Sequence, residues 1–240
     1  MELLHIEDVS KSFGAIRVAD GVSLTVAEGD ALGIIGPNGA GKTSLFNLIG
    51  GKLKPDSGRV HFLGKDVTPL AMEGRCRAGM GRTFQVPKPF SKMTVLENCL
   101  VAATAGGRMR ESQCYGRCAE ILDQMRLIRK ANELAGSLTL LERKALEVAR
   151  ALSSQPRLLL LDEIAGGLTE EEATELVKMI KTVHRNGTTI IWIEHIVHAL
   201  MAVATRLAVI DFGAKVMEGE PAEVMESQVV KRIYMGMESV

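Results

Sequence analysis

Hydrophobic and polar residues alternate along the first part of the chain, and this pattern predicts β-strands. The alternation is clear near residues 3–10 and 22–26, with a break at Gly14 between them. A similar segment at 57–67 is expected to form a strand followed by a turn. Because successive side chains of a strand point to opposite faces, such segments are typical of antiparallel strands with one buried face. They predict a small antiparallel β lobe.

From residue 94 onward, apolar positions recur every three to four residues, which predicts helices. The segment 94–135 is expected to form two helices, separated at Gly106-Gly107. Short apolar runs then alternate with helical segments, with strands expected at 157–162, 188–193 and 206–210 and helices at 140–153, 170–185 and 196–202. A hairpin at 212–218 and a short helix at 221–226 complete the pattern. The alternation predicts an α/β fold with a parallel sheet flanked by helices.

A glycine-rich stretch between a short apolar run and a helical segment carries the strongest chemical signal. It fits the phosphate-binding pattern G-x-x-x-x-G-K-[ST], and its residues are Gly36, Pro37, Asn38, Gly39, Ala40, Gly41, Lys42 and Thr43. Glycines let backbone N–H groups close around anionic oxygens, and the lysine reaches the outer phosphates. Thr43 offers a hydroxyl to Mg²⁺ at a helix N-terminus, and Ser44 beside it is counted among the nucleotide-binding residues. The stretch predicts a P-loop NTPase core.

Four leucines followed by two acids form the second motif, at residues 158–163. The leucines are typical of a central buried strand, and acids at its carboxyl end lie where open α/β sheets bind ligands. We assign Asp162 to the coordination sphere of Mg²⁺ and Glu163 to the general base that orients the attacking water. The same sequence would also result from two acids without a function at a solvated strand end. Downstream of a phosphate loop, an acidic pair that faces the loop from a neighbouring strand is the favoured interpretation.

Charge and cysteine content narrow the class of protein. The chain of 240 residues has 29 basic and 29 acidic side chains, so nothing in the balance indicates nucleic acid or anionic lipid as a partner. No apolar run approaches the length of a membrane span, and no secretory signal is seen. The cysteines are expected to be reduced thiols without a metal, because no second ligand pair follows their spacing; they are Cys76, Cys99, Cys114 and Cys118.

With both motifs in place, the chain resembles the ATP-binding subunits of ABC transporters over nearly its whole length. Residues 28–43 resemble that family's Walker A region, and 158–163 resemble its Walker B strand with the catalytic glutamate. The resemblance implies three further site residues. Phe13 would stack on adenine, Gln85 would reach the metal and couple to membrane subunits, and His195 would contact the terminal phosphate. Each of the three, taken alone, also fits a structural role; their order and spacing favour the family.

The resemblance also implies partners and a location. The segment 81–87, the run 93–98 and the ending 230–236 are similar to ATPases of branched-chain or hydrophobic amino-acid importers, and the ending also resembles the ATPase of lipopolysaccharide extraction. We therefore expect ATP, Mg²⁺, two transmembrane permease subunits and a second ATPase subunit, in a heterodimer or alternatively a homodimer. A periplasmic solute-binding protein would act indirectly. The chain would be one nucleotide-binding domain, 1–240, peripheral on the cytoplasmic face of the membrane.

Within this domain, the resemblance implies a helical subdomain and a segment that couples to the permeases. A helical subdomain is expected at about 90–153, and the segment 86–93 after Gln85 is expected to transmit changes to the permeases. Phe90 and Met93 are candidates for exposed apolar contacts there, with a core role equally compatible. The alternatives to an importer motor are a soluble ABC-type ATPase and a non-hydrolysing, nucleotide-gated adaptor.

The chain departs from the family at its signature motif, Leu-Ser-Gly-Gly-Gln, which in the family closes over ATP held by the second subunit. The corresponding residues are Leu138, Thr139, Leu140, Leu141 and Glu142. Thr139 and Glu142 predict a capping box that begins a helix, so the Thr139 hydroxyl would still face the partner's terminal phosphate. The leucines remove the close backbone approach that glycine permits. The motif is either a tolerated variant, which we favour, or a sign of weak hydrolysis at the shared site. A second departure is Ile164, which stands where proline is usual.

Overall fold

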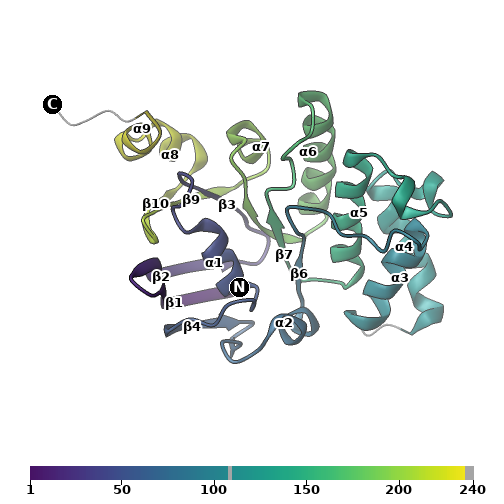
Figure 1. Ribbon diagram of the computed structural model, residues 1–240, viewed down its shortest axis with the longest axis horizontal. Coiled ribbons are helices and arrows are strands. Elements are labelled where there is room, and N and C mark those ends of the chain that lie inside the picture. Colours follow the sequence, from purple (N-terminus) through teal and green to yellow (C-terminus); the bar gives the residue numbers. More distant parts are fainter. Residues whose placement is uncertain (108–109, 236–240) are drawn as a thin grey trace. The chain divides into compact units, whose positions relative to one another are not determined.

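The computed structural model describes residues 1–107 and 110–235 and divides the chain into two compact units. The first unit comprises residues 1–72 and the part from Thr189 onward, and the second comprises Glu73–Thr188. Both contain strands and helices, which Figure 1 labels. The predicted assignment of 1–240 to one domain with a helical subdomain stays a prediction. Gly236, the last residue of the importer-like ending, lies outside the described residues.

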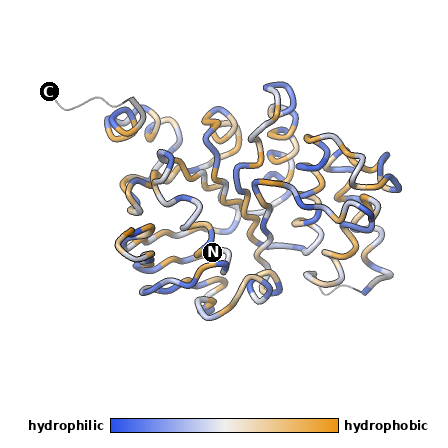
Figure 2. Tube along the Cα trace, viewed as in Figure 1, coloured by the Kyte–Doolittle hydropathy of each residue, from blue (hydrophilic) through white to orange (hydrophobic). Residues whose placement is uncertain are grey.

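An antiparallel sheet forms one part of the first unit, as the alternating pattern predicts. Its strand order is β2-β1-β4-β5, and the strands are β1 (Glu2–Phe13), β2 (Ile16–Ala27), β4 (Ser57–Phe62) and β5 (Lys65–Asp66). Leu4, Ile6 and Val9 are fully buried on β1, while His5, Glu7 and Asp8 are more accessible. Figure 2 shows the corresponding change between hydrophobic and hydrophilic positions along these strands. The predicted antiparallel lobe is confirmed.

The first unit also contains the strand that leads into the phosphate loop. Here the order is β10-β9-β3-β8, with β3 (Ala31–Ile35) parallel to both β8 (Thr189–Ile193) and β9 (Arg206–Asp211), and β10 (Ala214–Gly219) antiparallel to β9. All residues of β3 and β8 are buried, as expected of parallel strands covered on both faces. A side chain at Gly33 would place its Cβ 2.4 Å from Cδ2 of Leu207, so the Leu207 side chain would have to move to make room for it.

The helices of the first unit follow the predicted positions, with one addition. They are α1 (Lys42–Ile49), α7 (Val197–Met201), α8 (Pro221–Glu226) and α9 (Gln228–Met235). The last of these was not predicted. Its start is marked by Ser227, whose hydroxyl accepts a hydrogen bond from the backbone N–H of Val230 at 3.2 Å. Serine at a helix N-terminus is a local signal, so α9 was within reach of sequence analysis.

The second unit consists mainly of helices with two parallel strands, β6 (Met80–Arg82) and β7 (Leu158–Asp162). Its helices are α2 (Met72–Ala78), α3 (Val95–Ala105), α4 (Glu111–Gln124), α5 (Leu140–Ser153) and α6 (Glu170–Arg185), with short 3₁₀ turns at Ile128–Lys130 and Ala135–Ser137. The break predicted at Gly106-Gly107 is confirmed, since α3 ends directly before it. Nowhere in 1–107 or 110–235 is a helix both long and apolar enough to cross a membrane.

Three helices of the second unit begin with the same local device. A threonine side chain accepts the N–H of a glutamate three residues later, and that glutamate accepts the threonine N–H in return; the pairs are Thr94–Glu97, Thr139–Glu142 and Thr169–Glu172. Each box satisfies two N–H groups that the helix itself leaves without partners. The box predicted at the altered signature motif is therefore confirmed, and it fixes where α5 starts.

Three of the four cysteines lie in the core of the helical part of this unit. Cys99 on α3 and both Cys114 and Cys118 on α4 are fully buried, whereas Cys76 is half-buried. Burial raises the pKa of the Cys99 thiol to about 12, with the Ser153 hydroxyl offsetting part of the effect. Burial also raises the pKa of Cys118. Because the thiolate is the reactive form, the buried thiols are core groups rather than nucleophiles.

This burial predicts the thiol reactivity of the folded protein. With a disulfide reagent at pH 8, Cys76 is expected to react rapidly, and the buried thiols only after denaturation. Burial blocks access to all three, and it also disfavours the thiolates of Cys99 and Cys118. The release of the reagent's chromophore measures the number of reacting thiols. A Cys76→Ser variant serves as the control and should show no rapid phase. Rapid reaction of a second thiol in the native protein would contradict the packing of α3 against α4.

Candidate functional site

The phosphate loop connects β3 to α1 and is closed by its own lysine. Lys42 is the first residue of α1 and only 7% exposed. Its Nζ donates hydrogen bonds to the carbonyl oxygens of Gly36 at 2.7 Å and Pro37 at 2.9 Å. The ammonium group therefore lies over the loop that the sequence assigns to phosphate binding. The carbonyl oxygens are neutral acceptors. A charged phosphate oxygen would form a stronger hydrogen bond with the ammonium group and could replace them.

Two glycines of this loop are required by close packing as well as by backbone conformation. Gly36 and Gly41 have φ values of 153° and 99°, and an added Cβ would lie 2.0 Å from the carbonyl oxygen of Ile210 and 2.3 Å from that of Val18, respectively. Gly39 also has a positive φ, 82°, but nothing lies within 4 Å of an added Cβ. The loop is thus fitted tightly against β9 and β2 at two points and is open at its tip.

The remaining candidate residues of the first unit lie on exposed positions. The side chain of Phe13, at the end of β1, is 51% exposed, with Lys11 Nζ 5.6 Å from its ring centroid. Thr43 is exposed and Ser44 is half-buried at the start of α1. His195 follows β8, and its side chain is 51% exposed. Its backbone N–H donates to the carboxylate of the buried Glu194 at 3.1 Å.

The acidic pair lies in the second unit, at the carboxyl end of β7. Asp162 is the last residue of the strand and 6% exposed. Glu163 has φ 44°, a left-handed conformation that is uncommon for a residue other than glycine. The amide nitrogen Nε2 of Gln85 donates to Oε2 of Glu163 at 2.6 Å. The structure therefore brings together two of the predicted catalytic residues, one of them on a strained backbone of the kind found at functional sites.

A basic residue that the sequence analysis did not single out contacts the other acid. Nη2 of Arg82 donates to Oδ2 of Asp162 at 2.9 Å, and each of the two side chains is 9% exposed. The hydroxyl of Thr83 accepts the backbone N–H of Asp162 at 3.2 Å and lies 3.4 Å from the carbonyl oxygen of Leu160. In segment 82–85, every residue except Phe84 therefore forms a hydrogen bond with the acidic pair. The missed signal is a short strand, 80–82, which ends three residues before the predicted glutamine.

The altered signature motif keeps a well-formed helix start. Thr139 N donates to Glu142 Oε2 at 2.9 Å, and Glu142 N donates to the Thr139 hydroxyl at 3.4 Å. Lys130 Nζ lies 2.8 Å from Glu142. Burial opposes the ionised form of Glu142, but the hydrogen bonds from Lys130 and Thr139 outweigh it and lower the pKa of this carboxyl. Leu140 is 39% exposed beside this cap.

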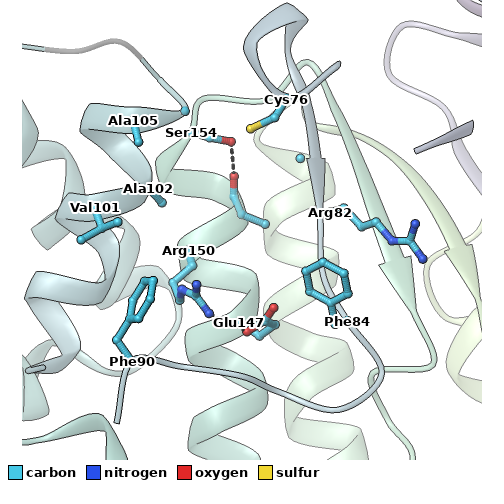
Figure 3. Close-up of a pocket in the computed structure, with 13 residues that line it drawn as sticks. Cys76, Arg82, Phe84, Phe90, Val101, Ala102, Ala105, Glu147, Arg150 and Ser154 are labelled. Carbon is cyan, nitrogen blue, oxygen red and sulfur yellow. Dashed lines mark hydrogen bonds and ion pairs between the residues drawn. The ribbon is translucent and has the colours of Figure 1, made fainter. Parts of the chain in front are cut away.

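A cavity of about 250 Å³ lies between segment 84–90 and helices α3 and α5 (Figure 3). Phe84, Phe90 and Val101 line it with partly exposed apolar surface. The guanidinium carbon of Arg150 lies 5.2 Å from the ring centroid of Phe90, and the group donates to Glu147 at 3.0 Å. Burial raises the pKa of Glu147, which Arg150 partly offsets. We call this cavity the groove.

Asn98 holds the predicted coupling segment in place along the groove. Its buried side chain accepts the backbone N–H of Phe90 at 2.8 Å and donates to the carbonyl oxygen of the same residue at 3.1 Å. The Phe90 side chain is 46% exposed, while Met93 is half-buried. Of the two apolar candidates, Phe90 is the one that presents its ring at the surface.

Comparison with known proteins decides the family. The model of the family described as "ABC transporter" matches residues 19–166. The chain belongs to the ABC transporter family. It is 34% identical to the high-affinity branched-chain amino acid transport ATP-binding protein LivG of Salmonella typhimurium, over 98% of each chain. It is also 30% identical to the lipopolysaccharide export system ATP-binding protein LptB of Haemophilus influenzae, again over 98% of each chain.

The solved structures agree. The crystal structure of the ADP conformation of an ATP-binding cassette of an ABC transporter matches with a TM-score of 0.90 and 33% identity, covering 99% of this chain and 100% of the other. The predicted ABC-type α/β fold is confirmed. The chain is an ATP-hydrolysing, nucleotide-binding subunit of the ABC type. ABC ATPase subunits dimerise and work with transmembrane permease components. Individual site residues in this chain stay predictions.

The packing of the phosphate loop predicts unequal effects of two similar substitutions. Gly39→Ala is expected to cost about 1 kcal/mol of unfolding free energy, because only the left-handed backbone opposes it. Gly41→Ala is expected to cost more than about 3 kcal/mol, because the new Cβ also collides with the carbonyl oxygen of Val18. Urea unfolding of the two variants and the wild type measures the difference. Equal losses would show that β2 does not constrain the loop.

Proposed function

We propose that the chain is the ATP-hydrolysing motor subunit of an importer for branched-chain or related hydrophobic amino acids. The observation that carries the proposal is full-length similarity at 34% identity to LivG, together with the importer-like segment 81–87. The similarity to LptB supports a second candidate, the motor of a lipopolysaccharide exporter. A soluble ABC ATPase without permeases is the third candidate and has no comparable support.

In the proposed site, ATP lies along the first unit with its phosphates at residues 36–43 and its adenine on Phe13. Lys42 exchanges the carbonyl oxygens of Gly36 and Pro37 for oxygens of the outer phosphates. The exposed ring of Phe13 supplies a stacking surface of about the size of a base. Ser44 contributes to the phosphate contacts at the start of α1, where N–H groups point toward an anion.

The residues present fit Mg²⁺. Thr43, Gln85 and Asp162 offer a hydroxyl, an amide and a carboxylate oxygen, the hard donors that this ion prefers, and few protein ligands suffice because phosphates and waters complete its shell. When bound, Mg²⁺ neutralises charge on the phosphates. Asp162 contributes a carboxylate that β7 holds at the strand end. His195, which follows β8 with an exposed side chain, is proposed to contact the terminal phosphate.

Glu163 is the proposed general base for in-line attack of water on the terminal phosphate. Its hydrogen bond with Gln85 fixes the orientation of the carboxylate, and the left-handed backbone directs this residue away from the path of the strand. Gln85 in turn begins the segment that lines the groove. A change in that segment would therefore alter the position of the base.

The second ATPase subunit is proposed to receive the N-terminus of α5 against its own ATP. Thr139 is exposed and the first N–H groups of α5 remain available at the capped end. This preserved cap supports the interpretation of the leucine-containing motif as a tolerated variant. A heterodimer is the favoured assembly, because the resemblance to amino-acid importer ATPases implies a second, different ATPase subunit.

We assign the groove to a cytoplasmic segment of a permease subunit. Partly exposed aromatic rings at Phe84 and Phe90 give such a segment apolar anchors, and aromatic residues dominate the binding energy of many interfaces. The groove is continuous with Gln85 along the chain, so occupation there and hydrolysis would be linked. We therefore propose that the ATPase binds at the cytoplasmic face of the membrane.

The role of Glu163 predicts a separation of binding from turnover. Glu163→Gln is expected to lower ATP turnover by about 10²-fold or more while ATP affinity is retained, because the amide cannot take a proton. Steady-state phosphate release and equilibrium nucleotide binding measure the two quantities. Glu171→Gln, an exposed glutamate on α6, is the matched control. Equal turnover of Glu163→Gln and wild type would remove Glu163 as the base.

A complementary variant tests the phosphate loop in the same assays. Lys42→Ala is expected to abolish tight ATP binding, because the ammonium group is lost from the loop. Unchanged affinity would contradict the assignment of residues 36–43 to the phosphates.

The importer assignment predicts a phenotype that depends on the groove. In cells that lack this chain, the wild-type protein, expressed with its candidate permease subunits, should restore uptake of labelled leucine. Phe90→Ser should fail to do so and should lower co-purification with the permease about tenfold, because a central aromatic anchor is lost. Phe212→Ser, at an equally aromatic but separate exposed position, is the control. Thermal unfolding checks that both variants fold.

Two results would contradict this assignment. If cells that lack this chain take up leucine normally but accumulate lipopolysaccharide in the inner membrane, the exporter would be favoured. Purification without any polytopic membrane protein would favour a soluble ATPase.

A further inference from the structure

The ion pair between Arg82 and Asp162 is a contact that the proposed chemistry does not use. Nη2 and Oδ2 lie 2.9 Å apart, and both side chains are almost completely buried. The carboxylate is the one that the sequence assigns to a divalent cation. In this structure, a guanidinium group satisfies it instead.

Strand pairing builds this contact. Arg82 on β6 lies beside Leu160 on β7 in the parallel register, and Asp162 is two residues further along β7 on the same face. The Thr83 hydroxyl accepts the N–H of Asp162 and fixes the backbone at the same point. The strand register therefore sets the two side chains on the same face of the sheet, within reach of each other.

We propose that Arg82 is a positioning residue that serves as the built-in counter-cation of Asp162, and that it competes with Mg²⁺ for this carboxylate. The inference rests on the proposed role of Asp162 at the metal. Before metal arrives, the guanidinium compensates a buried negative charge that would otherwise be costly. When metal arrives, two cations at one carboxylate repel each other, so tighter pairing with Arg82 means weaker metal binding.

The same guanidinium is connected to the groove. Its central carbon lies 5.6 Å from the ring centroid of Phe84, within the range of a cation–π contact. Figure 3 shows the ring of Phe84 beside the groove while the guanidinium of Arg82 points away from it. Arg82 thus lies between Asp162 on one side and the ring of Phe84 on the other. If the guanidinium left Asp162, it would keep its favourable contact with this ring.

The test is the Mg²⁺ dependence of ATP binding. Arg82→Gln removes the competing cation and should lower the Mg²⁺ concentration for half-maximal ATP affinity by about five- to a hundredfold, the usual range of coupling between two sites. Arg82→Lys keeps the charge but loses the planar fork, so an intermediate shift is expected. Arg117→Gln removes an exposed arginine on α4 and should change nothing. An unchanged or increased Mg²⁺ requirement in Arg82→Gln would overturn the proposal.

A second measurement needs neither nucleotide nor metal. In chelator, Arg82→Gln and Asp162→Asn should each lower the unfolding temperature, because each leaves a buried partner alone. The double variant should lose much less than the sum, since the pair is removed together. Additive losses would refute the pairing. If Arg82→Gln alone does not fold, the Arg82→Lys shift in Mg²⁺ dependence carries the test, and an unshifted value there rejects the competition.

The two levels of the proposal fail in different ways. Loss of the proposed function would show as ATP binding that Lys42→Ala leaves unchanged. Failure of the present inference would show as normal, Lys42-dependent ATP binding whose Mg²⁺ requirement does not respond to Arg82.

Discussion

Close approach of backbone to backbone around residues 36–43 is the constraint on which the nucleotide-binding half depends. Gly36 and Gly41 are in near contact with carbonyl oxygens of β9 and β2, and no side chain fits at either position. The N–H of Gly213, in the turn between β9 and β10, donates to the carbonyl oxygen of Ala40 at 2.8 Å and braces the loop from the same side. Shape is therefore imposed on the loop from outside. In the proposed function, Lys42 would exchange its carbonyl oxygen partners for phosphate oxygens within a loop whose shape is already set.

The second unit solves a different problem, which is to hold two adjacent carboxylates at the end of β7. Asp162 is almost completely buried, and burial of an unpaired charge is expensive, so this acid requires a compensating group. That group is the guanidinium of Arg82, the last residue of β6, while the half-buried Glu163 accepts a hydrogen bond from Gln85, three residues further along the same segment. The same segment continues into Phe84 and Phe90 at the groove. Stabilisation of the acids and presentation of the groove are consequently not independent, because one stretch of backbone serves both.

The features that the sequence predicts depend on residues close together in the chain, whereas the features that it misses depend on contacts between distant segments. The phosphate loop, the buried leucine strand and the Thr139–Glu142 cap each depend on residues a few positions apart, so their patterns survive in a single sequence. Helix α2 and strand β6 are too short to show a period. The partnership of Arg82 with Asp162 depends on the register between β6 and β7, which are far apart in the chain. At the groove, the Asn98 side chain accepts a hydrogen bond from the Phe90 backbone, and no sequence spacing predicts this contact.

The leucines of the altered signature motif are easier to understand once their neighbours are considered. Leu140 begins α5, and an added Cβ at Gly167, in the segment after the acidic pair, would lie 3.5 Å from its Cδ2. That distance is an ordinary van der Waals contact, so Leu140 lies close to the segment after the acidic pair without crowding it. Part of the leucine surface packs within its own subunit, and 39% remains exposed. Because the capping box leaves the first N–H groups of α5 in place, apolar surface is added next to the helix end without removal of its donors. That combination is compatible with a tolerated variant, although the cap also serves simply to begin α5, as the same box does at α3 and α6.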